Sequence, residues 1–192
     1  MSSIIPQYLR GENRVIVTAR MRLMPATVAL ARAELTDRAE SARLLSAAVP
    51  DAWPPEILAD ALPVFLEWIE AAPEQVGWYV WYAVIQSAGE ASGVLAAGGG
   101  FKGPPRDGTV EIGYSVLPEF QGQGYATELV RALIDWAFAQ PGVLRIIAET
   151  TEDNTPSVRL LLRLGFTRAN EAADEPGHVR FALDAHRGKV FE

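Results

Sequence analysis

The residues best suited to chemistry lie in the stretch QGQGYATELV, where Gly122 and Gly124 come directly before a predicted amphipathic helix. Glycine adopts positive φ angles and carries no Cβ, so a ligand can approach the backbone closely. The first amides of a helix have no partner within it, and the helix dipole places partial positive charge there. Such a loop can bind an anion, a phosphate for example, through backbone N–H groups.

An isolated QGQG is also compatible with a plain tight turn. Two well-known phosphate loops are excluded, because the chain has no GxxxxGK[ST] sequence and Thr127 stands where GxGxxG needs its third glycine. Arg106 is the one cation between Lys102 and Arg131. We therefore expect backbone amides to supply most of the attraction for an anion.

Other chemistry-bearing residues are scarce in this chain. It has no cysteine, which excludes disulfides, thiolate metal sites and thiol nucleophiles. Its two histidines, His178 and His186, lack the spacing of metal ligands, so we expect no metal. The net charge of -7 and pI near 4.9 disfavour nucleic acid, which is bound through clustered Lys and Arg, and slightly favour a cationic partner.

Length and composition indicate one packed domain. The 192 residues are 49% hydrophobic and 21% charged, a balance typical of a soluble protein. The longest uncharged stretch, residues 76–89, is too short to span a bilayer. Arg10, Glu12 and Arg14 stand where a signal peptide needs an apolar run, so we expect a cytoplasmic protein without membrane contact.

The first quarter of the chain is predicted to contain an extension, a strand and a helix. Residues 1–26 lack a sustained period and are interpreted as an N-terminal extension with room for a short strand, before a single domain at residues 27–192. TVALARAEL alternates as a half-buried strand would. TDRAESARLLSAAVP follows as a helix that Thr36 or Asp37 caps and Pro50 stops.

A second helix and a meander of strands come next. Residues 51–74 have apolar residues at helical spacing with a kink predicted at Pro63, and Trp53, Phe65 and Trp68 are predicted to lie in the core. GWYVWYAVIQ and SGVLAAGGGF are two strands of a hairpin whose turn is SAGEAS. TVEIGYSVLP is a third strand, ended by a proline.

After the glycine loop and its helix, which begins near Ala126, the chain alternates strand and helix. GVLRIIAET is a strand, and NTPSVRLLLRLGF is a helix capped by Asn154 or Thr155 and ended by Gly165. GHVRFAL is a closing strand. Because a strand, helix, strand order requires a parallel crossover, the sheet is predicted to be mixed.

Two blocks together resemble the GNAT family of acyl-CoA-dependent N-acyltransferases, and within it the branch of the ribosomal-protein alanine N-acetyltransferases. They are EIGYSVLPEFQGQGYATELV and, about thirty residues later, AETTEDNTPSVRLLLRLGF. The family signature Gln/Arg-x-x-Gly-x-Gly/Ala is matched by Gln121, Gly124 and Ala126, and its second block by Asn154, Ser157, Gly165 and Phe166. The specific part of the resemblance covers about residues 109–184.

The resemblance implies an α+β (mixed α/β) fold. Its sheet is twisted, mixed and mostly antiparallel, with helices on both faces, and two central parallel strands at about residues 110–117 and 143–150 splay apart. Acyl-CoA would lie in that opening, with its pyrophosphate on the loop amides and its pantetheine paired like an added strand. The cofactor-binding residues so implied are Tyr114, Val116, Gln121, Gly122, Gln123, Gly124, Tyr125, Ala126, Thr127, Asn154 and Ser157.

The reaction needs a neutral amine, and relatives carry an acidic residue at the places of Glu111 and Glu149. Either carboxylate could take the proton of the bound ammonium. We slightly prefer Glu149, because the end of its strand would lie nearer the thioester. For each, the alternative is a solvated residue or a structural ion pair with an arginine such as Arg145.

The departing thiolate needs a proton, and many relatives supply it from a tyrosine where this chain has Leu161. A tyrosine acid at that position is therefore excluded here. Ser157, Tyr114, Tyr125 or water would take its place. Ser157 joins the two glutamates as a catalytic candidate.

The resemblance thus implies an N-acetyltransferase that moves the acetyl group of acetyl-CoA to a primary amine by direct attack, without a metal. The acceptor could be a protein N-terminus or a small amine, and its choice is expected to depend on residues 51–74 and 171–177. The alternative is a noncatalytic acyl-CoA-binding sensor or assembly module. The chain could be a monomer or a homodimer.

Overall fold

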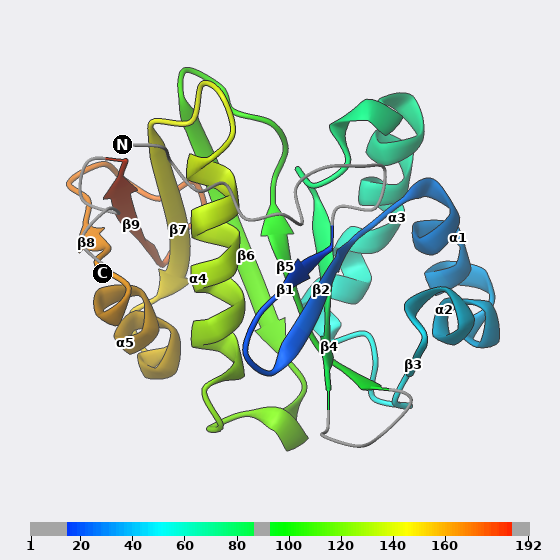
Figure 1. The fold of residues 1–192 in the computed structure, drawn as a ribbon. Helices are drawn as coiled ribbons and strands as arrows, with labels where there is room; N and C mark the ends of the chain where they lie inside the picture. Colours follow the sequence, from blue (N-terminus) through cyan, green and yellow to red (C-terminus); the bar gives the residue numbers. More distant parts are fainter. Residues whose placement is uncertain (1–14, 87–92, 186–192) are drawn as a thin grey trace, which may run out of the picture.

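Short strands and amphipathic helices alternate along the chain, as the hydrophobic patterns lead one to expect. The computed structural model describes residues 15–86 and 93–185 (Figure 1). The strands are β1 (Ile16–Val17), β2 (Met21–Pro25), β3 (Ala47–Ala48), β4 (Val80–Ile85), β5 (Gly93–Phe101), β6 (Thr109–Val116), β7 (Arg145–Thr151), β8 (Thr167–Arg168) and β9 (His178–Asp184). The helices are α1 (Val28–Thr36), α2 (Arg38–Leu45), α3 (Glu56–Ala71), α4 (Tyr125–Phe138) and α5 (Thr155–Arg163).

All of these strands form one mixed sheet. Its order is β1-β2-β4-β5-β6-β7-β9-β8, and the short β3 pairs with β5 off this path. The β6–β7 and β3–β5 pairs are parallel, and the other pairs are antiparallel. The predicted α+β fold with a mostly antiparallel mixed sheet is thereby confirmed.

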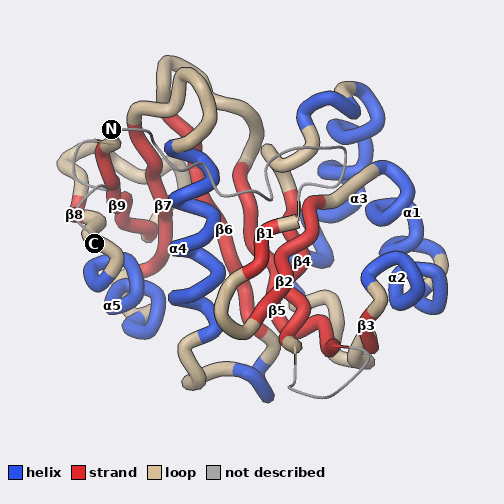
Figure 2. The backbone as a smooth tube through the Cα atoms, viewed as in Figure 1, coloured by secondary structure: helices blue, strands red, loops and turns tan. Residues whose placement is uncertain are grey.

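The central parallel pair separates along its length. β6 and β7 are paired at Thr109–Arg145, Val110–Ile146 and Glu111–Ile147, and at no later residue pair of the described chain. Both strands continue, β6 as far as Val116 and β7 as far as Thr151. An opening therefore lies between residues 112–116 and 148–151, where the sequence predicts two splayed strands; Figure 2 shows the two strands diverging.

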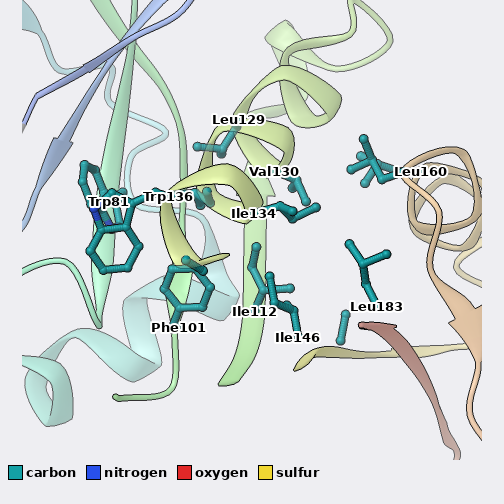
Figure 3. Packing of buried hydrophobic residues seen from close by; sticks show 14 of the residues in the cluster. Trp81, Phe101, Ile112, Leu129, Val130, Ile134, Trp136, Ile146, Leu160 and Leu183 are labelled. Atoms are coloured by element: carbon teal, nitrogen blue, oxygen red, sulfur yellow. The ribbon is translucent and has the colours of Figure 1, made fainter. Parts of the chain in front are cut away.

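Helices cover both faces of the sheet, with a hydrophobic core under each set. One core packs α4 and α5 against the central strands, and Figure 3 shows Leu129 and Ile134 of α4 above Ile112 of β6 and Ile146 of β7. The other core lies between the sheet and α1, α2 and α3, and contains Leu30, Leu45 and Leu62. The two faces of the sheet are therefore covered by different sets of helices.

The segment TVALARAEL is helix α1, so the prediction of a strand there is wrong. Thr27 caps this helix, since its side chain accepts a hydrogen bond from the Leu30 amide at 3.2 Å. The alternation of Val28 and Leu30 is too short to separate a period of 2 from one of 3.6, and three alanines favour helix. The next helix, α2, was predicted correctly, with Asp37 as its N-cap.

The sheet begins inside the segment interpreted as an extension. β2 pairs antiparallel with β4 from Met21–Ile85 to Pro25–Trp81, and Met21 and Leu23 are buried in the core beneath α4. The burial of alternate β2 residues is the half-buried strand pattern that the sequence analysis placed after residue 27. Residues 1–14 lie outside the described residues.

Helix α3 contains Pro63 within its span, as predicted. Trp53, just before the helix, is buried with 4% of its surface exposed, and Phe65 is partly buried against the same core. Trp68 is 42% exposed, so its assignment to the core is wrong.

The hairpin prediction is confirmed by the antiparallel pairing of β4 with β5, whereas its turn, SAGEAS, lies outside the described residues. No helix in residues 15–86 and 93–185 has the length and apolarity to cross a membrane. Within the same ranges, no cluster of three or more acidic, histidine or cysteine side chains could hold a metal ion.

Candidate active site

The glycine loop leads directly into α4. Gly122 and Gly124 have φ angles of +73° and +85°, a region that side chains other than glycine rarely adopt. Gly124 is the N-cap and provides no side-chain cap. The helical ladder starts with the Glu128 amide bonding the Gly124 carbonyl at 3.2 Å, so the amides of residues 125–127 precede it. Helix α4 therefore begins with amides that have no bond within the helix, at the end where its dipole is positive.

The two glutamines of the loop turn back toward the chain. Gln121 Nε2 donates to the carbonyl of Val116 at 2.9 Å, which ties the loop to the end of β6. Gln123 Nε2 donates to the carbonyl of Glu119 at 3.1 Å. Both side chains thus hold the shape of the loop, and what the loop offers a ligand is its backbone.

Arg20 lies against this loop, and the sequence analysis missed it. Its Nη1 donates to the Gln123 carbonyl at 2.8 Å and its Nε to Glu128 at 2.7 Å. The guanidinium also lies over the ring of Tyr125, 4.4 Å from the ring centroid. A cation therefore does stand at the loop, but it comes from the turn before β2. No local signal predicts this contact, because the partners are 103 and 108 residues apart.

Glu128 is held as a carboxylate by this arrangement. Burial alone would raise the pKa of Glu128, but hydrogen bonds from Thr18 and Arg20 and the charge of Arg20 outweigh it and lower that pKa. The Arg20 amide donates to the same carboxylate at 2.9 Å. The start of α4 is thereby attached to the first strands of the sheet.

Across the opening, Tyr114 of β6 meets Ser157 of α5. Their hydroxyl oxygens are 2.8 Å apart, and either can donate. Burial raises the pKa of Tyr114, and the hydrogen bond with Ser157 opposes that rise only in part. The phenol therefore stays protonated at neutral pH. The structure brings together two of the residues that the sequence analysis proposed as proton donors.

Helix α5 positions Ser157 through its cap. The Asn154 side chain accepts a hydrogen bond from the Ser157 amide at 3.3 Å, so Asn154 acts as the predicted N-cap. Leu161, one turn further on, is completely buried in the core. The side chain at the position of the usual tyrosine thus packs into the protein interior.

Glu111 lies on the face of β6 that looks toward α3. Its carboxylate is 14% exposed and pairs with Lys102 Nζ at 2.5 Å. Partial burial alone would lower the pKa of Lys102, but the hydrogen bond and charge of Glu111, with the charges of Glu175 and Glu149, raise it. This carboxylate therefore lies beside the opening with a half-exposed cation as its partner.

Glu149 is bound in a tighter network. It is opposite Arg180 in the β7–β9 ladder, and Arg180 Nε donates to it at 2.8 Å. The Asp174 amide donates to both of its oxygens at 3.1 Å. Its side chain is only 4% exposed and that of Arg180 is 15% exposed. The ion pair considered in the sequence analysis thus exists, with Arg180 rather than Arg145 as the partner.

A pocket of about 180 Å³ lies on the same side as Glu111. Helix α3 forms one wall, with Leu58, Ala61 and Phe65, and the glycines of β5 form the floor. Lys102, Gly113, Tyr114 and Ser115 close it toward β6. The pocket therefore adjoins the residues that could perform chemistry.

Comparison with known proteins agrees with this geometry. Residues 20–167 match the family model described as an acetyltransferase (GNAT) domain. The chain is also similar to YjdG, an uncharacterized N-acetyltransferase of Bacillus subtilis strain 168, with 29% identity over 161 residues, 83% of this chain and 94% of the relative.

Solved structures share the fold. RimJ of Mycobacterium smegmatis, in complex with CoA-disulfide, superposes with a TM-score of 0.54 at 20% identity, covering 87% of each chain. Ribosomal-protein-S5-alanine acetyltransferase of Vibrio fischeri gives a TM-score of 0.54 at 19% identity, covering 91% of this chain and 98% of that one. At this low sequence identity, the two superpositions establish a common fold and nothing about the substrate.

Proposed function

The chain belongs to the GNAT acetyltransferase family, and from that premise we propose that it transfers the acetyl group of acetyl-CoA to a primary amine. The observation that carries the proposal is the end of the β6–β7 pairing at Glu111–Ile147, beyond which β6 continues toward the glycine loop. Beyond that pair the β7-facing edge of residues 112–116 has no strand partner in the described chain. An amide-containing chain such as pantetheine can pair with an edge of this kind.

The loop supports the binding of the pyrophosphate. The amides at residues 125–127 and the positive end of α4 attract an anion, and Gly122 leaves open space, since no atom lies within 4 Å of a Cβ built there. Arg20 adds a positive charge beside the loop and donates to the Gln123 carbonyl, which would otherwise face a phosphate group without a hydrogen-bond partner. These features fit the cosubstrate that the family implies.

Glu111 is the general base in this proposal, in place of the earlier preference for Glu149. The bound ammonium gives a proton to Glu111, directly or through a water, and the neutral nitrogen attacks the acetyl carbonyl carbon. Lys102, at 53% exposure, can move aside at small cost, whereas Glu149 is 4% exposed and bound by Arg180 and a backbone amide. Glu149 then organises the loop at residues 171–177.

The Tyr114–Ser157 pair completes the transfer. As the C–N bond forms and the C–S bond breaks, the sulfur leaves as a thiolate and accepts a proton from Ser157. Tyr114 replaces that proton through the 2.8 Å contact between the two hydroxyls. The nitrogen loses its second proton as the amide forms, and this proton passes through water to Tyr114, so both hydroxyls are restored. The elevated pKa of Tyr114 keeps the proton available at neutral pH.

Thermal unfolding with acetyl-CoA, coenzyme A and ATP tests the cosubstrate. A ligand at a hundredfold excess over its dissociation constant stabilises the native state by about 2.7 kcal/mol. We expect stabilisation by both CoA compounds and none by ATP. Absence of a shift with the CoA compounds, in a folded sample, would contradict the proposal.

Turnover then separates the enzyme from a noncatalytic acyl-CoA-binding module. Release of free CoA thiol is followed during incubation with acetyl-CoA and a set of primary amines. Amine-dependent release supports catalysis. Binding of acetyl-CoA without release under any of these conditions supports the binding module instead.

A further inference from the structure

The pocket between α3 and β4, β5 and β6 opens beside Glu111. Side chains alternate along a strand, so Glu111, Gly113 and Ser115 share one face of β6, and the last two line the pocket. Lys102 also lines it while it contacts Glu111 at 2.5 Å. A nitrogen that delivers its proton to Glu111 can therefore carry a substituent that enters this pocket.

The floor of the pocket offers carbon rather than hydrogen-bonding groups. Gly98, Gly99 and Gly100 belong to β5, which is paired with β4 on one side and with β6 on the other. Their backbone polar groups are consequently engaged in two ladders. The glycines also make room, since a Cβ at Gly98 would lie 3.0 Å from Trp53 and 3.1 Å from Leu58.

Most polar atoms in the walls are engaged as well. The Tyr79 hydroxyl bonds Gln75 at 2.8 Å, the Tyr114 hydroxyl bonds Ser157 and the Lys102 ammonium bonds Glu111. Ser115 adds one hydroxyl near β6. The remaining wall is apolar and comes mainly from Leu58, Ala61 and Phe65 of α3.

The apolar surface continues outward from the pocket. The ring of Phe65 lies 5.7 Å from that of Trp68, and the ring of Tyr79 lies 5.8 Å from Trp68. Trp68 and Val64 are each 42% exposed, although both are large apolar side chains. An aromatic path thus leads from the solvent to the pocket wall.

Charges around the pocket mouth favour an ammonium group. Lys102, which lines the pocket, lies in the electrostatic field of three carboxylates, Glu111, Glu175 and Glu149. A cationic amine is attracted to such a site, whereas a carboxylate is repelled. An acceptor that suits both the mouth and the pocket combines an ammonium with an apolar group.

We propose that the acceptor is a primary amine that carries a compact apolar substituent, aliphatic or aromatic, which occupies the pocket between α3 and the glycines of β5. This inference rests on the proposed function and specifies its substrate class. Ala61 sets the depth of the pocket from the helix side. A larger residue there selects against large substituents.

A series of amines tests the proposal with acetyl-CoA as donor and CoA release as readout. Ethylamine, butylamine and 2-phenylethylamine differ in apolar size, and 2-methoxyethylamine matches butylamine in length but contains an ether oxygen. Each methylene in an apolar pocket is worth about tenfold or more in kcat/KM. We expect butylamine to exceed ethylamine about a hundredfold, and 2-methoxyethylamine to fall at least tenfold below butylamine, all on a free-amine basis.

Two variants of the same helix locate the effect. Ala61→Phe fills the pocket and should lower kcat/KM for butylamine and 2-phenylethylamine about tenfold or more, while ethylamine keeps its value. Ala71→Phe makes the same change at an exposed position of α3 outside the pocket lining and should leave the series unchanged. Equal losses for all three amines in Ala61→Phe would overturn the pocket assignment.

The inference can fail while the proposed function stands. Release of CoA with every amine at the same kcat/KM would overturn the apolar substrate class and leave acetyl transfer intact. Absence of release with every amine contradicts the proposed function. In that case thermal unfolding with CoA and each amine still measures binding of the amine to the pocket. Equal stabilisation by ethylamine and 2-phenylethylamine would overturn the assignment of an apolar site.

Discussion

The hydroxyl groups of Tyr114 and Ser157 lie 2.8 Å apart, although one residue belongs to β6 and the other to the first turn of α5. The contact spans the place where β6 and β7 have separated. Each hydroxyl holds the other in position beside the route that a thioester would follow. Because each hydroxyl depends on the other, substitution of either residue removes the hydrogen bond between them.

We first predict that Ser157→Ala lowers kcat by about a hundredfold, because a positioned proton donor contributes at about this level or more. Tyr114→Phe should also lower kcat, and the double variant should lose less than the product of the two single losses. Ser157→Thr keeps a hydroxyl and should restore most of the activity. A wild-type kcat in Ser157→Ala, from steady-state CoA release, would remove this residue from the mechanism.

A second prediction separates the two glutamates. Glu111→Gln should lower kcat/KM by about a hundredfold or more through loss of the base, with little change in stability. Glu149→Gln should instead destabilise the fold by about 2 kcal/mol, because it removes a charged hydrogen-bond acceptor from the mostly buried Arg180 and leaves the exposed Asp174 as the remaining ion-pair partner. Urea unfolding and CoA release on both variants give the comparison. The reverse pattern would return Glu149 to the role of base.

The third prediction concerns the backbone of the glycine loop. Gly124→Ala should cost about 1–2 kcal/mol of stability, because φ is +85° there, and should also raise the dissociation constant for acetyl-CoA. Gly142→Ala is the control for backbone strain alone, since a Cβ at Gly124 would also lie 3.3 Å from Arg20 Nη2. Gly142 has a φ of +83°, no atom lies within 4 Å of its Cβ position and it stands outside the loop, so it should carry the strain without the binding defect. Similar binding losses in both variants, measured by calorimetry, would contradict a local role for Gly124.

The fourth prediction is a pH dependence of stability from Arg20 and Glu128. The folded-state pKa of Glu128 is lowered, so its contribution is fully present above the ordinary value of about 4.3 and is lost as pH falls through the lower folded value. Between about pH 5 and pH 3 the wild type should therefore lose stability more steeply than Glu128→Gln. Urea unfolding at intervals across this range measures the difference. Identical slopes would show that the pair makes no such contribution.

The fifth prediction uses Glu34, a half-buried carboxylate of α1. Glu34 accepts from Trp53 Nε1 at 2.7 Å and from the Tyr82 hydroxyl, yet its burial raises the pKa of Glu34 above the ordinary value. Protonated Glu34 contributes to the free energy of unfolding. This contribution is fully present at a pH below the pKa of Glu34 in the unfolded chain, and it is lost as pH rises through the higher pKa of the folded state. Glu34→Gln should thus raise the melting temperature by about 3 °C at about pH 8 and by less at about pH 5, as followed by circular dichroism. A larger gain at the lower pH would reverse the assigned direction.

Much of the second half of the fold could be predicted, because its boundaries carry local chemistry. Asn154 caps α5 and Gly165, with a φ of +90°, follows its end. Gly124 precedes α4 and the proline after β6 marks the end of that strand. Each signal acts on its own helix or strand, so one sequence contains it in full.

The first quarter was less predictable, because the hydrophobic pattern of its short segments fits both the period of 2 of a strand and the period of 3.6 of a helix. Val28 and Leu30 fit a strand or a helix, and only the cap formed by Thr27 decides between them. Met21 and Leu23 fit a strand, but its place in the sheet depends on pairing with β4 far along the chain. Local propensity contains no information on such a partner.

The candidate site was predictable to the extent that it is local. The glycine loop and the candidate carboxylates were found, whereas the partners of those carboxylates were not. Arg180 stands opposite Glu149 in the β7–β9 ladder, so an explicit antiparallel register for the last two strands could have predicted their contact. Arg20 offered no comparable signal, since it approaches the loop from a turn 103 residues away.

The short ladder between β6 and β7 also has a mechanical meaning. Three residue pairs join them, so the sheet consists of two halves, one ending at β6 and the other beginning at β7, that share a short stretch of pairing. Tyr114 belongs to the half that ends at β6, and Ser157 follows β7 in the other half. A pantetheine chain bound between β6 and β7 would add contacts between the two halves. Binding of the cosubstrate would then reduce the relative motion of the two halves of the sheet, and release of CoA would restore that motion.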